Sequence, residues 1–307
     1  MTKQKILVSG SLVYDKIMNF NGRLKDHIMM DKIHKLSVSF VVDKLKINFG
    51  GTAGNIGYNL KLLGLEPIII SQAGDDFSNY QKWLLKNKIS LAEIKIIKHK
   101  NTASANIITD RDDNQITVLH LETMGVAARI KEEKIRKMGK IDLAIVSPGN
   151  KEDMLKGVQV YKKIGIEYIA DPGQQIPVFN NQEMKSFIKG AKVLIVNDYE
   201  FELISRKIKA TRQQIEKMME ILIITYGADG SEIYNNGKVI KIEAVRPKKN
   251  VDPTGAGDAY RAGLIKGLID GWELKKCGEL AAWVAKHAVE HYGTQEHKFS
   301  YKVDFKG

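Results

Sequence analysis

Residues 251–263 have the sequence VDPTGAGDAYRAG, in which a strand-like segment ends at Pro253 and a helix begins after three small residues. The small residues are Gly255, Ala256 and Gly257, and with almost no side chains they let backbone N–H groups approach an anion closely. The positive end of the helix dipole favours negative charge at the same place. This segment therefore predicts an oxyanion-binding turn.

Asp258 follows this turn directly and lies in the first turn of the predicted helix. A carboxylate there can accept the proton of an attacking hydroxyl while the turn stabilises charge on a transferring phosphoryl group. Asp is also a common helix cap, but the adjoining small residues favour the catalytic interpretation. GAGDAY lacks the third glycine of the dinucleotide fingerprint, and no G-x-x-x-x-G-K-[ST] sequence occurs. A Rossmann dehydrogenase and a P-loop enzyme are therefore disfavoured.

A second glycine-rich segment, GGTAGN at residues 50–55, opens another predicted helix. Gly51 permits close backbone approach, and Asn55 offers both a hydrogen-bond donor and an acceptor. Asp15 comes shortly after the first predicted strand, and α/β folds place ligands outside the carboxyl ends of strands. Its carboxylate can accept hydrogen bonds from two vicinal hydroxyls, as in a ribose. Either feature alone could be a plain turn, and beside the anion-binding turn they indicate a sugar acceptor site.

Short apolar runs alternate with amphipathic helical stretches along most of the chain, which predicts an α/β fold with a mostly parallel central sheet covered by helices on both faces. Two regions break this rhythm, residues 36–42 with 44–49 and residues 103–109 with 115–121, and all four segments are predicted to be antiparallel strands with one exposed face. We therefore predict a small β lid of residues 15–48 and 99–122. The large nucleotide-binding and catalytic domain would comprise residues 1–14, 49–98 and 123–307.

The composition of the 307 residues, 43% hydrophobic and 27% charged, is that of an ordinary globular protein. The formal charge of +12 comes from scattered lysines, which favours solubility and attraction of nucleotides rather than nucleic-acid binding. A single cysteine, Cys277, excludes an internal disulfide. No apolar run is long enough to span a membrane, and the N-terminus does not read as a signal peptide. We expect a cytoplasmic protein without nucleic-acid or membrane partners.

Together these motifs resemble the ribokinase-like (PfkB) carbohydrate kinase family. The resemblance rests on residues 50–55 continuing through Gly64 to Gly74, on the highly specific DPTGAGD at 252–258, on NDYE at 197–200, which is similar to the family's N-x-x-E element, and on TYGADG at 225–230. Order and spacing agree over nearly the whole chain. YDKIMNF, DPGQQIP and the late HYGTQEH are similar to bacterial adenosine or nucleoside kinases.

This resemblance implies the ribokinase-like fold and a role for each matching residue. Asp258 would be the base, with Gly255, Ala256 and Gly257 as the anion hole, and Asp15, Gly51 and Asn55 would hold the acceptor. Asn197 and Glu200 would organise Mg²⁺, Glu200 through water, and Thr225, Gly227 and Gly230 would border the ATP. Asp252 resembles a position linked to a monovalent cation such as K⁺.

The predicted reaction is transfer of the γ-phosphate of ATP to a primary sugar hydroxyl of a nucleoside, with adenosine the expected acceptor. Ribose, fructose and fructose 6-phosphate remain alternatives, because the same catalytic groups would serve any of these sugars. Arg23, Lys25 and His27 could bind the phosphate of a phosphorylated acceptor. A non-catalytic binding protein is a further alternative, which the presence of Asp258 disfavours. The sequence leaves open whether the protein is a monomer or a homodimer joined through its lid.

Two other features leave alternatives open. LETM at residues 121–124 stands where relatives carry Pro-Gly-Ala-Met, so nucleoside identity is open, and Arg261 either faces the phosphate or lies on the surface. The sequence HAVEH at 287–291 fits the H-x-x-E-H pattern of zinc proteases, with Glu296, His297 and Asp304 as candidates for a third ligand. We expect this helix to be structural instead.

Overall fold

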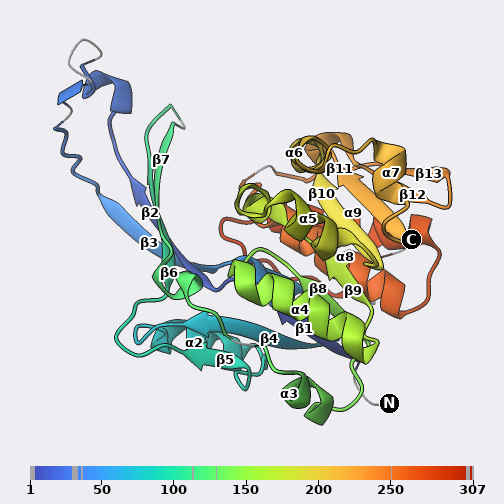
Figure 1. The fold of residues 1–307 in the computed structure, drawn as a ribbon. Helices are drawn as coiled ribbons and strands as arrows, with labels where there is room; N and C mark the ends of the chain where they lie inside the picture. The colour runs from blue at the N-terminus through green and yellow to red at the C-terminus, as the bar shows by residue number, and fades with distance from the viewer. Residues whose placement is uncertain are drawn as a thin grey trace.

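The computed structural model describes residues 4–29, 34–35, 37–112, 114–128, 130–249, 251–301 and 305. These residues form a large α/β domain with one central sheet, and a separate small sheet projects from it as an arm (Figure 1). The predicted fold class, a mostly parallel sheet with helices and a second small sheet, is confirmed. No described helix is both long and apolar enough to cross a membrane.

The central sheet has nine strands among the described residues, in the order β13-β12-β11-β10-β9-β8-β1-β4-β5. Their bounds are β1 (Lys5–Ser9), β4 (Glu66–Ala73), β5 (Ile94–Ile96), β8 (Leu143–Val146), β9 (Tyr168–Ala170), β10 (Val193–Asn197), β11 (Ile221–Thr225), β12 (Ser231–Asn235) and β13 (Lys238–Ile242). All neighbouring strands from β5 to β11 are parallel, whereas β12 and β13 pair antiparallel at one end. The parallel strands therefore end at one common edge.

Helices cover both faces of this sheet. One face carries α1 (Thr52–Leu62), α2 (Ser78–Lys86), α8 (Ala256–Ile269) and α9 (Leu274–Val289), and the other carries α3 (Glu132–Lys137), α4 (Lys151–Ile164), α5 (Asn181–Ile188), α6 (Asp198–Ile208) and α7 (Arg212–Glu216). Because side chains alternate along a strand, β1 serves two cores: Ile6 and Val8 pack with the first set of helices, and Leu7 with the second. Short 3₁₀ helices connect these elements at Leu24–Asp26, Glu122–Gly125, Gly173–Val178 and Gly227–Asp229.

The small sheet has the order β3-β2-β6-β7, with β2 (Val13–Asn19), β3 (Lys44–Gly50), β6 (Ala103–Thr109) and β7 (Gln115–His120). The prediction of a strand at residues 36–42 is wrong over residues 37–42, and residue 36 lies outside the described residues. Instead β2, which was not predicted, lies between β3 and β6 and is parallel to β6. Both edges of β2 are thereby occupied, and Phe40 packs its ring against Phe20 and His27.

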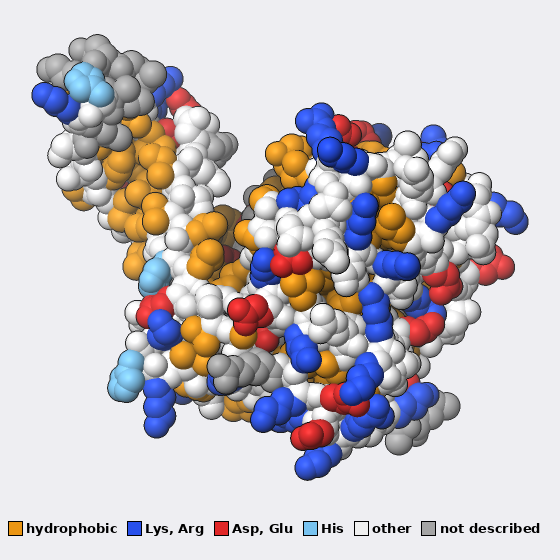
Figure 2. Space-filling view, in the orientation of Figure 1, with side chains coloured by type: hydrophobic (Ala, Val, Ile, Leu, Met, Phe, Trp, Pro, Cys, Tyr) orange, Lys and Arg blue, Asp and Glu red, His pale blue; other side chains and the backbone are white. Residues whose placement is uncertain are grey.

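The small sheet exposes apolar side chains, whereas lysines and arginines are spread over the helices of the large domain (Figure 2). Leu45, Ile47, Val118 and Leu119 are 51–62% exposed. The scattered positive charge agrees with the even distribution of lysine in the sequence.

Candidate active site

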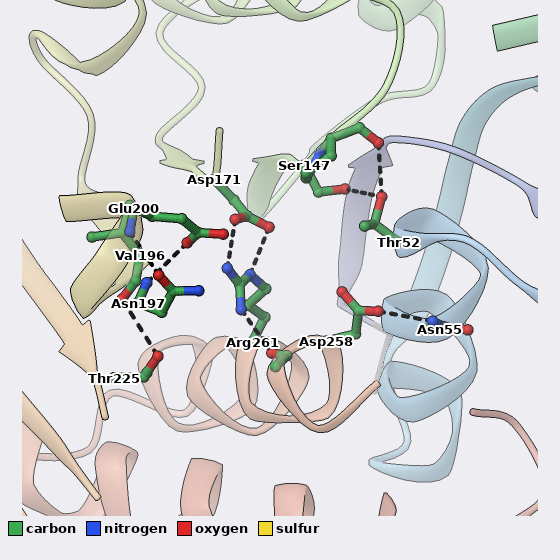
Figure 3. Close-up of polar contacts among 12 residues, drawn as sticks. Thr52, Asn55, Ser147, Asp171, Val196, Asn197, Glu200, Thr225, Asp258 and Arg261 are labelled. Carbon is green, nitrogen blue, oxygen red and sulfur yellow. Dashed lines mark hydrogen bonds and ion pairs between the residues drawn. The ribbon is translucent and has the colours of Figure 1, made fainter. Parts of the chain in front are cut away.

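The common edge of the parallel strands gathers most of the predicted site residues. Ser147 follows β8, Asp171 follows β9, and Asn197 and Thr225 are the last residues of β10 and β11. Figure 3 shows these residues on one side of α8, which carries Asp258 in its first turn and Arg261 one turn further on. Parallel strands and the helices that follow them thus bring distant motifs to one place.

The predicted oxyanion turn forms the start of α8. Gly255 is the N-cap with φ +81°, and a Cβ at this position would lie 2.8 Å from Cγ2 of Thr294, so glycine is required. The N–H of Ala256 donates to the Pro253 carbonyl (3.2 Å). Among the described residues, no acceptor partner is found for the N–H groups of Gly257 and Asp258, which are therefore available to an anion.

Asp258 is partly buried in the first turn of α8. Its Oδ2 accepts a hydrogen bond from Nδ2 of Asn55 (2.8 Å). Burial raises the pKa of Asp258 to about 6, while the nearby Arg261 and the bond from Asn55 oppose that rise. At neutral pH this carboxylate is mostly ionised yet basic enough to take a proton from a hydroxyl, as a general base requires.

Asn55 is held in one orientation by residues that sequence reasoning did not assign. Its Oδ1 accepts hydrogen bonds from Oγ1 of Thr294 (2.7 Å) and Nε2 of Gln295 (3.1 Å), which turns Nδ2 toward Asp258. Oε1 of Gln295 in turn accepts from Nε1 of Trp83 (3.0 Å). The only sequence signal for Thr294 and Gln295 was their place in the late HYGTQEH segment.

Replacing Gln295 tests this orientation. In Gln295→Met the Asn55 oxygen loses one of its two donors, so we expect kcat to fall about tenfold through misplacement of Asp258. We also expect the unpaired polar groups to cost about 1–3 kcal/mol of unfolding free energy. Steady-state kinetics and thermal denaturation measure the two effects, with the exposed Gln81→Met on α2 as control. An unchanged kcat in a folded Gln295→Met protein would contradict the role.

Asp15 lies on β2 opposite Asn48 of β3, and its carboxylate is close enough to Asp258 for the two charges to interact. Burial raises the pKa of Asp15 to about 7, and the negative charges of Asp252 and Asp258 add to that rise. A Cβ at residue 50 would lie 2.2 Å from Oδ2 of Asp15, so the glycine there leaves room for the carboxylate.

Gly51 needs its glycine for reasons of the backbone. Its φ is +88°, and a Cβ would lie 2.5 Å from the carbonyl oxygen of Ser11. The Gly51 carbonyl accepts from the N–H of Asn55 (2.9 Å) and so belongs to the start of α1. Gly51 and Asn55 thus lie at the start of α1, directly after β3, whereas Asp15 lies on the neighbouring strand β2 beside residue 50.

The NDYE segment forms a capping box at the start of α6. Oδ1 of Asn197 accepts from the N–H of Glu200 (2.7 Å), and Oε2 of Glu200 accepts from the N–H of Asn197 (2.9 Å). This local role alone can explain the spacing of the two residues. Burial raises the pKa of Glu200, with Asp171 adding to the rise and Arg261 opposing it.

Mg²⁺ fits this corner of the site only with water among its ligands. No group of three His, Cys, Asp or Glu side chains able to hold a metal exists in the described part of the chain. One partly buried carboxylate, Glu200, with Oε1 outside the capping box, suits an ion that keeps most of its waters.

The predicted ATP-contacting residues lie where β11 turns into β12. Oγ1 of Thr225 donates to the Val196 carbonyl (3.4 Å), which joins the ends of β11 and β10. Gly227 and Gly230 have φ values of +60° and +92°, and a Cβ at 230 would lie 2.1 Å from the Ile242 carbonyl oxygen. The turn by itself therefore requires these glycines, and their contact with nucleotide stays a prediction.

Arg261 is not a surface residue. Its side chain is 10% exposed and forms an ion pair with Asp171, which is 1% exposed. Nε and one Nη of Arg261 donate to the two carboxylate oxygens of Asp171, each over 2.6 Å. Asp171 was not assigned from sequence, although it opens the DPGQQIP segment.

The basic residues that were candidates for binding a phosphorylated sugar, and the LETM segment, contact other groups of the protein. Arg23 and Lys25 both pair with Asp112, at 3.1 and 3.2 Å, within the projecting arm. Oε2 of Glu122, in the departing LETM segment, accepts from the Asn101 N–H (3.0 Å). His27 stacks edge-on against Phe20.

The H-x-x-E-H segment forms no metal site with the described residues. Nδ1 of His291 bonds to the carbonyl of His287 (2.9 Å), and Nε2 of His297 to Oδ1 of Asn59 (2.7 Å). His287 lies on α9 and the other two histidines follow that helix, and the candidate ligand Asp304 lies outside the described residues.

A proton-accepting carboxylate beside free helix N–H groups is suited to phosphoryl transfer onto an alcohol, and this chemistry defines a phosphotransferase. Residues 9–299 match the model of the pfkB family of carbohydrate kinases. The chain belongs to this family.

Three relatives illustrate where the chain lies within the family. It is 30% identical to a nucleoside kinase of Methanocaldococcus jannaschii, covering 95% of this chain and 92% of that one. The solved structure of the nucleoside kinase of Burkholderia thailandensis in complex with inosine has a TM-score of 0.84 at 33% identity, over 95% and 93% of the two chains. An ATP-dependent 6-phosphofructokinase of Thermoanaerobacterium thermosaccharolyticum is 25% identical over 83% of each chain.

Proposed function

We propose that this protein is an ATP-dependent nucleoside kinase that phosphorylates the primary hydroxyl of the ribose, with adenosine as the first acceptor to test. The observation that carries the proposal is the placement of Asp258, which lies between Asn55 and the free N–H groups at the start of α8. This geometry combines a base for the hydroxyl with donors for the phosphoryl oxygens.

The step follows from these groups. The Asp258 carboxylate accepts the proton of the hydroxyl, whose oxygen bonds to the γ-phosphorus, while the bond from that phosphorus to the oxygen it shares with the β-phosphate breaks and ADP leaves. The N–H groups of Gly257 and Asp258 stabilise the charge on the equatorial oxygens. A pKa of about 6 leaves Asp258 ionised before the step and able to release the proton afterwards.

The substrates would occupy opposite ends of this site. Asp15 and Asn55 would bind the ribose hydroxyls, with the Gly51 backbone close to the sugar. ATP would lie along Asn197 and Thr225 toward the turn that holds Gly227 and Gly230. Mg²⁺ would be held by Glu200 through water, and when bound it neutralises charge on the phosphates.

A nucleoside is favoured over a sugar phosphate by the basic side chains. Arg23 and Lys25 both pair with the Asp112 carboxylate in the arm, which competes with a phosphorylated sugar for these two cations. Two of the relatives above are nucleoside kinases, and one was solved with inosine. The likeness to a 6-phosphofructokinase keeps fructose 6-phosphate as the second candidate.

The small sheet would act as a lid over the acceptor, formed by residues 15–48 and 99–122. Asp15 lies on β2 of this sheet, so the lid contributes directly to the acceptor site. Its exposed apolar residues, Leu45 and Val118 among them, would suit a homodimer joined through the lids. Asp252 could border a K⁺ site, although its oxygens accept from the N–H groups of Thr254 and Gly293.

An acceptor panel tests the proposal. ADP release from Mg·ATP is measured with adenosine, other nucleosides, ribose, fructose and fructose 6-phosphate. We expect strong stimulation by nucleosides. Stimulation by a free or phosphorylated sugar alone would keep the mechanism and overturn the acceptor, and no stimulation by any compound would favour a non-catalytic binding protein.

A further inference from the structure

The buried ion pair between Arg261 and Asp171 joins the start of α8 to the end of β9. Both oxygens of Asp171 accept from the guanidinium over 2.6 Å, in the two-pronged geometry that arginine makes with carboxylates. At 10% and 1% exposure, the two side chains are largely withdrawn from solvent. A buried pair of this kind is costly to desolvate and is weak evidence of stabilisation by itself. We therefore expect this pair, which lies at the start of α8, to have a role other than stabilising the fold.

The guanidinium also contacts the catalytic turn. An Nη of Arg261 donates to the carbonyl of Gly257 (3.0 Å), the residue directly before Asp258. A Cβ at position 257 would lie 3.0 Å from that same Nη, so a side chain there would press on the guanidinium. Gly257 thus leaves room for Arg261 as well as for an anion. Arg261 is clamped between a strand end and the turn that carries the base (Figure 3).

The charges around Asp258 come from several elements. Arg261 on α8 opposes the rise in the pKa of Asp258, whereas the negative charge of Asp171 adds to it. Asp15 on β2 and Tyr80 on α2 also interact electrostatically with Asp258. Arg261 is the positively charged group in this set. Its ion pair with Asp171 fixes where the guanidinium lies.

We propose that Asp171 and Arg261 are positioning residues for phosphoryl transfer: Asp171 anchors the guanidinium, which fixes the first turn of α8 and holds a positive charge near Asp258. The inference rests on the proposed function, in which Asp258 is the base. It assigns to Arg261 an action through Asp258 and Gly257, in place of direct contact with the transferring phosphate.

The test compares three variants by their pH profiles of kcat. In Arg261→Gln/Asp171→Asn the pair keeps hydrogen bonds without charge, and we expect the acidic limb of kcat to move up by about one pH unit or more. Arg261→Lys keeps the charge and loses the planar fork, so kcat should fall about tenfold with the limb nearly unmoved. Asp171→Asn should lower kcat to a similar extent without moving the limb upward, since it removes a negative charge.

The controls separate this inference from the proposed function. Arg206→Gln/Glu202→Gln neutralises an exposed ion pair on α6 and should leave both kcat and the pH limb unchanged. Thermal denaturation and ATP binding show which variants are folded. If the folded variants keep the pH profile and the kcat of the parent protein, the positioning role is wrong, even if Asp258→Asn is inactive. If Asp258→Asn is active, the proposed base itself is wrong.

Discussion

Asp258→Asn is expected to lose at least about two orders of magnitude in kcat while ATP binding changes little. The amide keeps the size of the carboxylate and can still bond to Asn55, but it cannot accept the proton of the attacking hydroxyl. The helix N–H groups that stabilise the phosphoryl oxygens are untouched, so residual turnover should remain above that of free solution.

Thermal stability should rise in Asp258→Asn, whereas kcat falls. The folded state raises the pKa of Asp258 from 3.8 to about 6, so the folded protein binds this proton more tightly than the unfolded chain. Ionisation therefore costs stability as pH rises through about 6, and Asp258→Asn should melt at a higher temperature than the parent at pH 8.

Turnover, ATP binding by calorimetry and thermal melting together measure these effects. Asp270→Asn, at the other end of α8, is a matched control that should keep normal kinetics. Near-normal turnover of Asp258→Asn would mean that another group takes the proton.

Asp15→Asn is expected to raise the KM for the acceptor about hundredfold, with the KM for ATP unchanged. A carboxylate that accepts from two hydroxyls makes two charge-assisted hydrogen bonds, and the amide replaces both by weaker or missing ones. The exposed Asp43→Asn, directly before β3, provides the control. An unchanged acceptor KM would exclude Asp15 from the acceptor site.

The pH dependence of this effect follows from the pKa of Asp15, raised to about 7. The parental KM for the acceptor should fall as pH rises from 6 to 8, because ionised Asp15 accepts more strongly, and Asp15→Asn should lose that dependence. The variant should also melt higher at pH 8, since it removes the cost of burying a charged carboxylate and the repulsion with Asp252 and Asp258.

The sequence was sufficient for the parts of the site that depend on local signals. Gly255 to Asp258 and Gly51 to Asn55 were predicted as helix starts, and both are. Alternating strands and helices imply that such starts meet at one sheet edge, so Asn55 and Asp258 could be placed in one site before any contact was known.

Long-range contacts account for what was missed. Gln295 bonds to a residue 240 positions earlier, and Arg261 to one 90 positions earlier, and no local pattern signals either bond. The strand error has a similar cause: residues 37–42 have a strand-like composition, but Phe40 packs against Phe20 and His27 instead of adding a strand to the small sheet. The N-x-x-E spacing of Asn197 and Glu200 is a local signal, but this spacing is typical of a capping box as well as of a metal site.

The most direct test of the account is product analysis with adenosine and 5′-deoxyadenosine, which lacks the primary hydroxyl. With Mg·ATP and adenosine, we expect one nucleoside 5′-monophosphate for each ADP formed, and neither product above background from 5′-deoxyadenosine. Inosine and the other nucleosides are run in parallel to define the acceptor. ADP formed without a phosphorylated nucleoside, or phosphorylation confined to free sugars or sugar phosphates, would contradict the account.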